Sequence, residues 1–154
     1  MKTVTISINE ATALSQAIQL LSEIGADKRP IYKLPFKFSY PLARTLTKLQ
    51  EALKPIQEKN QEIFEGWDEE NRKLQDRIKA AEGPMKEKAV ADHSKAFKVR
   101  NDKWKEVAGG SIEVEVYEFQ KFTEAESEAI MSAGLTPVLL AQLAPMNLCL
   151  DEAA

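Results

Sequence analysis

One stretch decides the fold, residues 41–65, which read P-L-A-R-T-L-T-K-L-Q-E-A-L-K-P-I-Q-E-K-N-Q-E-I-F-E. Its seam positions are spaced alternately four and three residues apart: Leu42, Leu46, Leu49, Leu53, Ile56, Asn60 and Ile63. Such a heptad pattern predicts one long helix with an apolar seam along one side. Pro55 lies outside the seam, where we expect it to remove one backbone hydrogen bond and bend the helix.

An apolar seam of this kind packs against another helix of the same chain or against a second protein chain. The candidate interface seam consists of Leu46, Leu49, Leu53, Ile56 and Asn60. Asn60 has two interpretations: it fixes the register of the pairing, or it faces water near the end of the helix.

The helical pattern continues beyond the seam. Gly66 interrupts it, and residues 67–82 fit a weaker helix or a loop. Gly83-Pro84 is typical of a helix stop followed by a restart, and residues 85–108 again show helical spacing. Residues 41–108 are therefore expected to form a long antiparallel helical hairpin.

Both ends of the chain have a different pattern. Residues 3–8 and 111–119 alternate apolar and polar side chains, which predicts two half-buried strands. Short helices are expected after Thr123 and Thr136, both of which are good N-cap residues. We therefore predict an α+β fold in a single domain, 1–154. Residues 1–40 and 109–154 form a head with a small two- or three-stranded sheet and short helices, and residues 41–108 form the hairpin.

Composition limits the functions that this domain is equipped for. The chain has 154 residues, a formal net charge of −3, one cysteine and one histidine. A single cysteine excludes an internal disulfide and a thiolate-based zinc site, and fits a reducing compartment. The apolar runs are too short to cross a membrane, and the N-terminal residues lack the apolar block of a signal peptide. We expect a protein that is neither secreted nor embedded in a membrane.

Catalytic and metal-binding patterns are not found. His93 has no nucleophile in a recognisable setting, because the adjacent Ser94 would point about 100° away on a helix. Glu113 and Glu115 lack the loop spacing of a hard-cation site and fit a solvated acidic face. The sequence therefore predicts no catalytic residues, no metal and no cofactor.

The segment 28–48 has an uneven charge. It contains six cations and no acid, interleaved with aromatic residues. Because of Pro30, Pro35 and Pro41 we expect residues 28–40 to be extended, as an edge strand or a loop. The candidate binding residues are Lys33, Lys37, Tyr40 and Arg44. Either this surface binds a small ligand, nucleic acid or an acidic partner, or it neutralises the acidic strand 113–118 within the same molecule.

The stretch Leu34–Leu49, L-P-F-K-F-S-Y-P-L-A-R-T-L-T-K-L, resembles small uncharacterised proteins of tailed phages and prophages. The resemblance rests on Leu34, Pro35, Lys37, Tyr40, Ala43 and Arg44, then the Leu49/Leu53 seam, Ile112–Val116 and Val138–Leu143. Residues 67–81 depart from it, because they are more helical and more charged than the turn found there.

The resemblance implies a viral origin and a non-enzymatic role, in the host cytoplasm or in the virion. The leading hypothesis is an accessory phage protein that acts by protein–protein contact. Its partner would be a virion or assembly protein, a host defence factor that it inhibits, or a second copy of itself. A small-ligand or nucleic-acid binding protein using the segment 28–48 is the alternative.

Overall fold

The computed structural model describes residues 1–150 and has an α+β fold. The elements in chain order are β1 (Lys2–Ser7), α1 (Ile8–Leu21), α2 (Phe36–Ile63), α3 (Trp67–Ala80), α4 (Pro84–Ala108), β2 (Ser111–Val116), α5 (Glu124–Ser132), α6 (Pro137–Gln142) and the 3-10 helix η1 (Ala144–Met146). The predicted α+β class is confirmed at this level. Of the two sheet sizes that the sequence left open, the described residues form the two-stranded one.

The chain divides into two compact units. The first comprises residues 1–53 and 111–150, and the second comprises residues 54–110. The predicted head ended at residue 40, whereas the structure places residues 41–53 in the first unit as well. The division falls just before Pro55, where α2 lacks one backbone N–H. Residues 151–154 of the predicted head lie outside the described residues.

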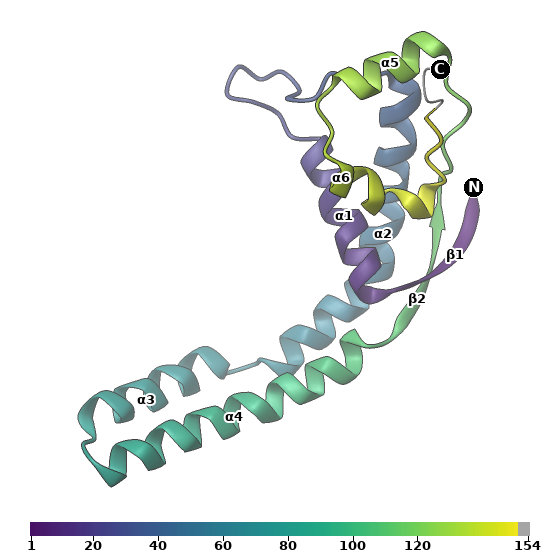
Figure 1. Ribbon diagram of the computed structural model, residues 1–154. Helices are drawn as coiled ribbons and strands as arrows, with labels where there is room; N and C mark the ends of the chain where they lie inside the picture. The colour runs from purple at the N-terminus through teal and green to yellow at the C-terminus, as the bar shows by residue number, and fades with distance from the viewer. Residues whose placement is uncertain (151–154) are drawn as a thin grey trace. The chain divides into compact units, whose positions relative to one another are not determined.

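The sheet of the first unit pairs the N-terminal strand with a strand that follows it by more than 100 residues (Figure 1). β1 and β2 are antiparallel, with Val4 opposite Val114 and Ile6 opposite Ile112. These four side chains share one face, because side chains alternate along a strand, and they pack on the core. The opposite face carries Thr5 across from Glu113, so the alternation predicted from sequence corresponds to one buried and one polar face.

Helix α1 follows β1 without a loop. Ser7 caps it, because its hydroxyl accepts the Glu10 N–H at 3.1 Å while the Glu10 carboxylate accepts the Ser7 N–H at 2.8 Å. One side of α1 is then buried at helical spacing by Ala11, Leu14 and Ile18. In Figure 1, α1 lies alongside the first part of α2 and is covered by α6.

Helix α2 begins five residues earlier than predicted. Residues 36–40 are helical, so the prediction that the whole of 28–40 is extended is wrong. The Pro35 carbonyl accepts the Phe38 N–H at 2.9 Å and the Ser39 N–H at 3.0 Å, which starts the first turn. Pro41 lies within the helix, where it removes one hydrogen bond without ending the helix.

The core of the first unit is built on the buried side of α2. Phe38, Leu42, Thr45, Leu49 and Leu53 follow each other three or four residues apart and are buried. Phe38 is fully buried and stacks on Phe119, with ring centroids 4.8 Å apart and an interplanar angle of 13°. This face contacts the apolar side chains of α1, both strands, α5 and α6 in one cluster.

A buried hydroxyl fixes α2 to the end of β2. Thr45 is fully buried, and its Oγ1 accepts the backbone N–H of Tyr117 at 2.9 Å. Tyr117 is the residue just beyond β2, where no strand partner is available for this N–H group. The hydroxyl therefore satisfies a donor that would otherwise lose its hydrogen bond.

Replacing Thr45 with valine is expected to lower the free energy of unfolding by about 1–3 kcal/mol, because the shape is kept while the Tyr117 N–H loses its acceptor. Urea unfolding followed by circular dichroism measures this change. Thr47→Val is the matched control, since Thr47 is exposed and bonds only to its own helix. Equal effects of the two substitutions would contradict this role of Thr45.

The second unit contains a helical hairpin made by α3 and α4, which lie side by side and antiparallel in Figure 1. Residues 67–80 are helix, which settles the choice that the sequence left open. Gly66 and Gly83, at either end of α3, have φ angles of 71° and 61°, a region that favours glycine. The antiparallel helix pair within the predicted hairpin, residues 41–108, is α3 with α4.

Candidate functional site

The residues predicted to bind a ligand lie at the start of α2 and in the loop before it. Lys33 is exposed in the loop, while Lys37, Tyr40 and Arg44 lie in the first turns of α2. Spacings of three, four and seven residues bring these last three to the same side of a helix. Tyr40 and Arg44 face away from the buried side that contains Phe38 and Leu42. Lys37 lies at the edge of that buried side and is only partly exposed.

Lys37 serves an internal contact. Its Nζ donates to the Lys121 carbonyl at 2.5 Å and lies 3.7 Å from the Glu126 carboxylate. The same ammonium lies 6.0 Å from the centre of the Phe122 ring. Lys37 therefore holds the segment before α5 against α2, and it is compensated by an acid of its own unit.

Arg44 is held by an aromatic residue rather than by an acid. Its guanidinium lies 5.3 Å from the centre of the Tyr117 ring, and its Nη2 donates to the Tyr117 hydroxyl at 3.2 Å. This hydrogen bond raises the pKa of Arg44 above its ordinary value, with a smaller contribution from the charges of Tyr117 and Tyr40. Arg44 keeps its other N–H donors for a ligand.

Lys48 supports the alternative interpretation, in which the basic segment neutralises the acidic strand of the same molecule. Its Nζ lies 3.8 Å from Glu115 on β2 and 3.5 Å from Glu51 on its own helix. The basic segment thus neutralises part of the acidic strand within the molecule. Within residues 1–150, Lys33 and Arg44 have no such acidic partner.

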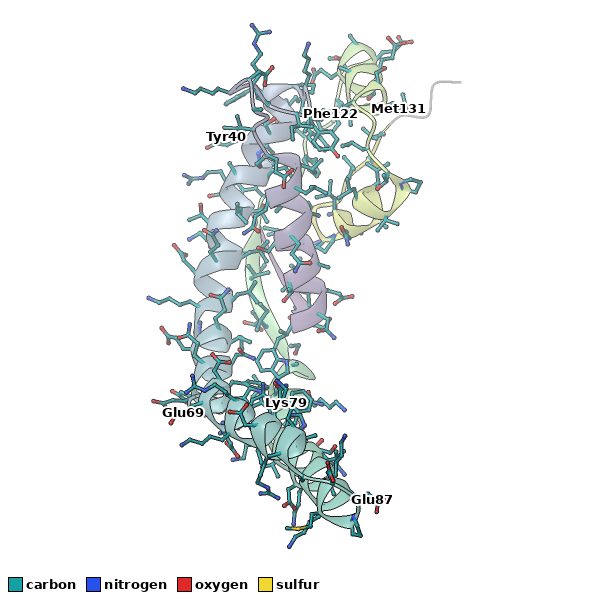
Figure 2. All side chains as sticks on the ribbon, turned by 90° about the vertical axis from the view of Figure 1, so that its left-hand side faces the viewer. Tyr40, Glu69, Lys79, Glu87, Phe122 and Met131 are labelled. Atoms are coloured by element: carbon teal, nitrogen blue, oxygen red, sulfur yellow. The ribbon has the colours of Figure 1, made fainter. Side chains whose placement is uncertain are left out.

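An exposed aromatic pair lies beside these cations, and sequence reasoning missed one of its members. Phe36 is 78% exposed and Tyr40 is 47% exposed, with ring centroids 5.5 Å apart and an interplanar angle of 36°. Figure 2 shows Tyr40 pointing away from the first unit, on the other side of α2 from Phe122. We call Phe36, Tyr40 and Arg44 the outer strip of α2. The four-residue spacing of these three residues could have predicted that they share one side of a helix.

The candidate interface seam divides between the two units. Leu49 and Leu53 are buried in the core of the first unit, and Leu46 is packed against that core. The interpretation of these leucines as an interface with another chain is therefore wrong, because they already contact α1 and the sheet side chains. Ile56 and Asn60 are half-buried in the second unit.

The α3–α4 hairpin buries very little. Within residues 67–108, α3 has no buried side chain and α4 buries only Ala89. Trp67 of α3 contacts two rings of α4, with its centroid 5.8 Å from that of His93 and 5.7 Å from that of Phe97. A hairpin with so small an interior gains little free energy from apolar burial.

Polar contacts hold the two helices in register. Arg77 Nη2 donates to Asp92 at 2.6 Å, and His93 Nε2 lies 2.7 Å from the Asn71 side-chain oxygen. His93, the single histidine of the chain, thus has a structural contact rather than a nucleophile beside it.

Arg100 makes the most extensive of these contacts. Its Nη1 donates to the Ile63 carbonyl at 2.6 Å and to the Glu65 carbonyl at 3.1 Å, while Nη2 donates to Glu70 at 2.7 Å. The guanidinium also lies 5.5 Å from the centre of the Trp67 ring. One side chain therefore joins the end of α2, the start of α3 and the middle of α4.

Acid is expected to weaken the hairpin through Asp92. The hydrogen bond from Arg77 lowers the pKa of Asp92. Desolvation opposes this shift, and the charges of Arg77, Lys88 and Lys95 add to it. A carboxylate with a lowered pKa in the folded state stabilises above its unfolded pKa, and this contribution is lost as the pH falls through the folded value.

The urea midpoint of the tryptophan fluorescence transition should therefore fall more steeply between pH 5 and pH 3 in the wild type than in Asp92→Asn. Both tryptophans, Trp67 and Trp104, report on the second unit. Parallel pH dependences for the two proteins would show that this contact does not stabilise the hairpin.

Apolar side chains stay exposed along both edges of the hairpin. Val90 and Phe97, seven residues apart on one side of α4, are 44% and 42% exposed. Met85 and Val99, on the other side of α4, are 75% and 51% exposed. The hollow beside Val90 has a volume of about 610 Å³ and is lined by Gly83, Lys86, Glu87, Val90 and Ala91.

The charges of the hairpin surround these apolar edges. α4 carries seven cations and four acids. Figure 2 shows Glu69 on α3 and Glu87 on α4 pointing away from the hairpin. Among residues 1–150, only Arg100 of the seven α4 cations forms an ion pair. The surface of α4 is therefore basic and partly apolar.

Two further structural features concern membrane spans and metal ligands in residues 1–150. No helix in this part of the chain combines the length and the apolar character that a membrane span needs. Nor does any group of three or more histidine, cysteine, aspartate or glutamate side chains there converge as metal ligands would.

Comparison with protein-family models, with curated proteins and with solved structures finds no match for this chain. The molecule presents two candidate binding surfaces, the outer strip of α2 and the apolar edges of the α3–α4 hairpin.

Proposed function

We propose that this protein acts by contact, without catalysis, and that the α3–α4 hairpin is the part that binds a protein partner. The observation that carries the proposal is that the hairpin exposes more apolar side chains than it buries. It buries only Ala89, yet it leaves Val90, Phe97 and Val99 more than two-fifths exposed. A partner that covers these side chains gains apolar burial that the hairpin does not obtain alone.

The edge that contains Val90 and Phe97 suits a helical partner. Two apolar side chains seven residues apart on one side of α4 match the spacing of anchors on an amphipathic helix. The hollow beside Val90 accepts a side chain from that helix. The lysines of α4 favour acidic residues flanking the apolar anchors, because opposite charges steer the approach of the two surfaces.

We include three candidate partners in this proposal, and the resemblance to phage proteins provides the first two. An accessory phage protein with this hairpin binds a protein of the virion or its assembly, or a host defence factor that it blocks. A second copy of the chain is the third partner of the same chemistry, because α3 supplies the acidic residues Asp68, Glu69 and Glu70.

Site-specific photo-crosslinking tests this proposal. A photoreactive residue at position 90 of the full chain, produced in bacterial cells, should give one discrete adduct with another protein. The matched control is position 95, five residues along α4 and about 140° around the helix from Val90, where Lys95 is exposed. Mass spectrometry identifies the adduct, and light scattering at low and high salt shows whether the partner is a second copy.

Val90→Glu should then weaken binding of the identified partner by at least tenfold, since the change buries a charge in an apolar contact, while Lys95→Ala leaves it within twofold. Equal adducts from positions 90 and 95, or none from either, would contradict the proposal.

A further inference from the structure

We propose that the outer strip of α2, with Lys33 before it, binds single-stranded nucleic acid. Bases stack on Phe36 and Tyr40, and the backbone phosphates contact Lys33 and Arg44. This site lies in the first unit and is independent of the hairpin in the second.

The aromatic rings provide the first argument. Phe36 is the most exposed large apolar side chain of the described residues, at 78%, and Tyr40 follows it one turn later. The four-residue step between them is about 6 Å along the helix axis at 1.5 Å per residue. That step is close to the spacing of successive nucleotides in an extended, unstacked strand. Exposed aromatic rings at such a spacing are stacking platforms for bases.

Charge provides the second argument. Residues 28–48 contain no acid, and of their six cations two, Lys37 and Lys48, form ion pairs within the unit. The four others have no ion-pair partner in residues 1–150: Lys28, Arg29, Lys33 and Arg44. A positive surface beside exposed aromatic rings is complementary to a polyanion that carries flat, apolar groups.

The position of the Arg44 guanidinium also favours binding of a phosphate. The Tyr117 ring and hydroxyl hold its guanidinium in place, so less side-chain entropy is lost when a ligand binds. One of its five N–H donors is used by Tyr117. The remaining donors include a pair that fits two phosphate oxygens.

These features favour a single strand over the two other polyanions of similar charge. A duplex keeps its bases stacked inside, so Phe36 and Tyr40 would have nothing to stack on. An acidic peptide pairs with the cations but offers no flat group to the rings.

Fluorescence anisotropy with the full chain tests the proposal, using a labelled 12-nucleotide oligothymidylate as the probe. Unlabelled duplex of the same length and polyglutamate serve as competitors. With the two phosphate contacts of Lys33 and Arg44, the affinity should fall roughly 7-fold between 50 and 200 mM salt. Neither competitor should displace the probe at equal charge concentration.

Substitutions separate stacking from charge. Phe36→Ala should weaken binding about 5- to 100-fold, the effect of losing one stacked base, and Phe36→Trp should keep it. Met85→Ala is the matched control, because Met85 is 75% exposed in the other unit and should leave binding within twofold. Lys33→Ala should flatten the salt dependence, whereas Lys54→Ala, also at an exposed lysine, should not.

Three results would overturn the proposal. One is no binding of the oligothymidylate at 50 mM salt. Another is displacement by polyglutamate or duplex at equal charge concentration. The last is an equal effect of Phe36→Ala and Met85→Ala. Val90→Glu should leave this binding unchanged, so a failure here is distinct from a failure of the hairpin as a protein-binding surface.

Discussion

Replacing Phe38 with alanine is expected to lower the free energy of unfolding of the first unit by about 3–5 kcal/mol, the usual cost of truncating a buried phenylalanine. Phe38 is fully buried and contacts two further rings, Phe119 at 4.8 Å and Phe122 at 6.0 Å between centroids. Alanine leaves a cavity at the junction of α2 with the segment that follows β2. Urea unfolding followed by circular dichroism measures the loss.

The matched control lies two residues away on the same helix. Phe36→Ala removes the same side chain from a site that is 78% exposed, so it should change the free energy of unfolding by no more than about 0.5 kcal/mol. A similar loss from both substitutions would mean that α2 presents its faces differently. The small effect expected of Phe36→Ala also makes it a clean probe of binding.

Replacing Arg100 with alanine is expected to destabilise the second unit by about 2–3 kcal/mol, because hydrogen bonds from a charged donor are lost and backbone carbonyls lose their donor. Arg100 reaches the carbonyls of Ile63 and Glu65 and the carboxylate of Glu70. Tryptophan fluorescence measures the change directly, because both tryptophans lie in this unit.

Arg72→Ala is the control for this prediction, since Arg72 is exposed on α3 and has no ion-pair partner in residues 1–150. Arg100→Lys should recover only part of the loss, because a lysine keeps the charge but lacks the planar arrangement of donors that reaches several acceptors. If Arg100→Ala unfolds at the same urea concentration as Arg72→Ala, the contacts of Arg100 do not hold the unit together.

Local patterns predicted most of the elements. The apolar–polar alternation in residues 111–116 predicted β2, and Gly83-Pro84 and Gly109 predicted the two ends of α4. Both patterns depend only on residues that are close in sequence. The start of α2 could not be predicted this way. Pro35 and Pro41 argued against a helix, yet Phe38 lies four residues before Leu42 and extends the buried face, and the apolar burial outweighs one lost hydrogen bond.

The use of the seam depended on partners distant in sequence. A heptad pattern shows that Leu49 and Leu53 are buried, but it does not show against what. In the structure these leucines belong to one core with α1, β1 and β2, and they do not pack against another helix of a hairpin. Nothing in the spacing of 41–65 contains that information.

The contacts of the candidate binding residues also depend on residues that are distant in sequence. Tyr40 and Arg44 are exposed on one side of α2, as a surface role requires. Lys37 was indistinguishable from Lys33 in sequence, but its contacts with Lys121 and Glu126 come from residues more than 80 positions away. The contacts of Arg100 with the end of α2 are likewise tertiary.

Amide hydrogen exchange of the isolated full chain tests the central claim, that the α3–α4 hairpin needs a partner to complete its burial. Amides of α3 and α4 should exchange far faster than those of α1, β1 and β2, because the hairpin opens locally at a lower cost in free energy than the first unit. Equal protection in the two units would show that the hairpin is stable by itself, and would contradict the claim.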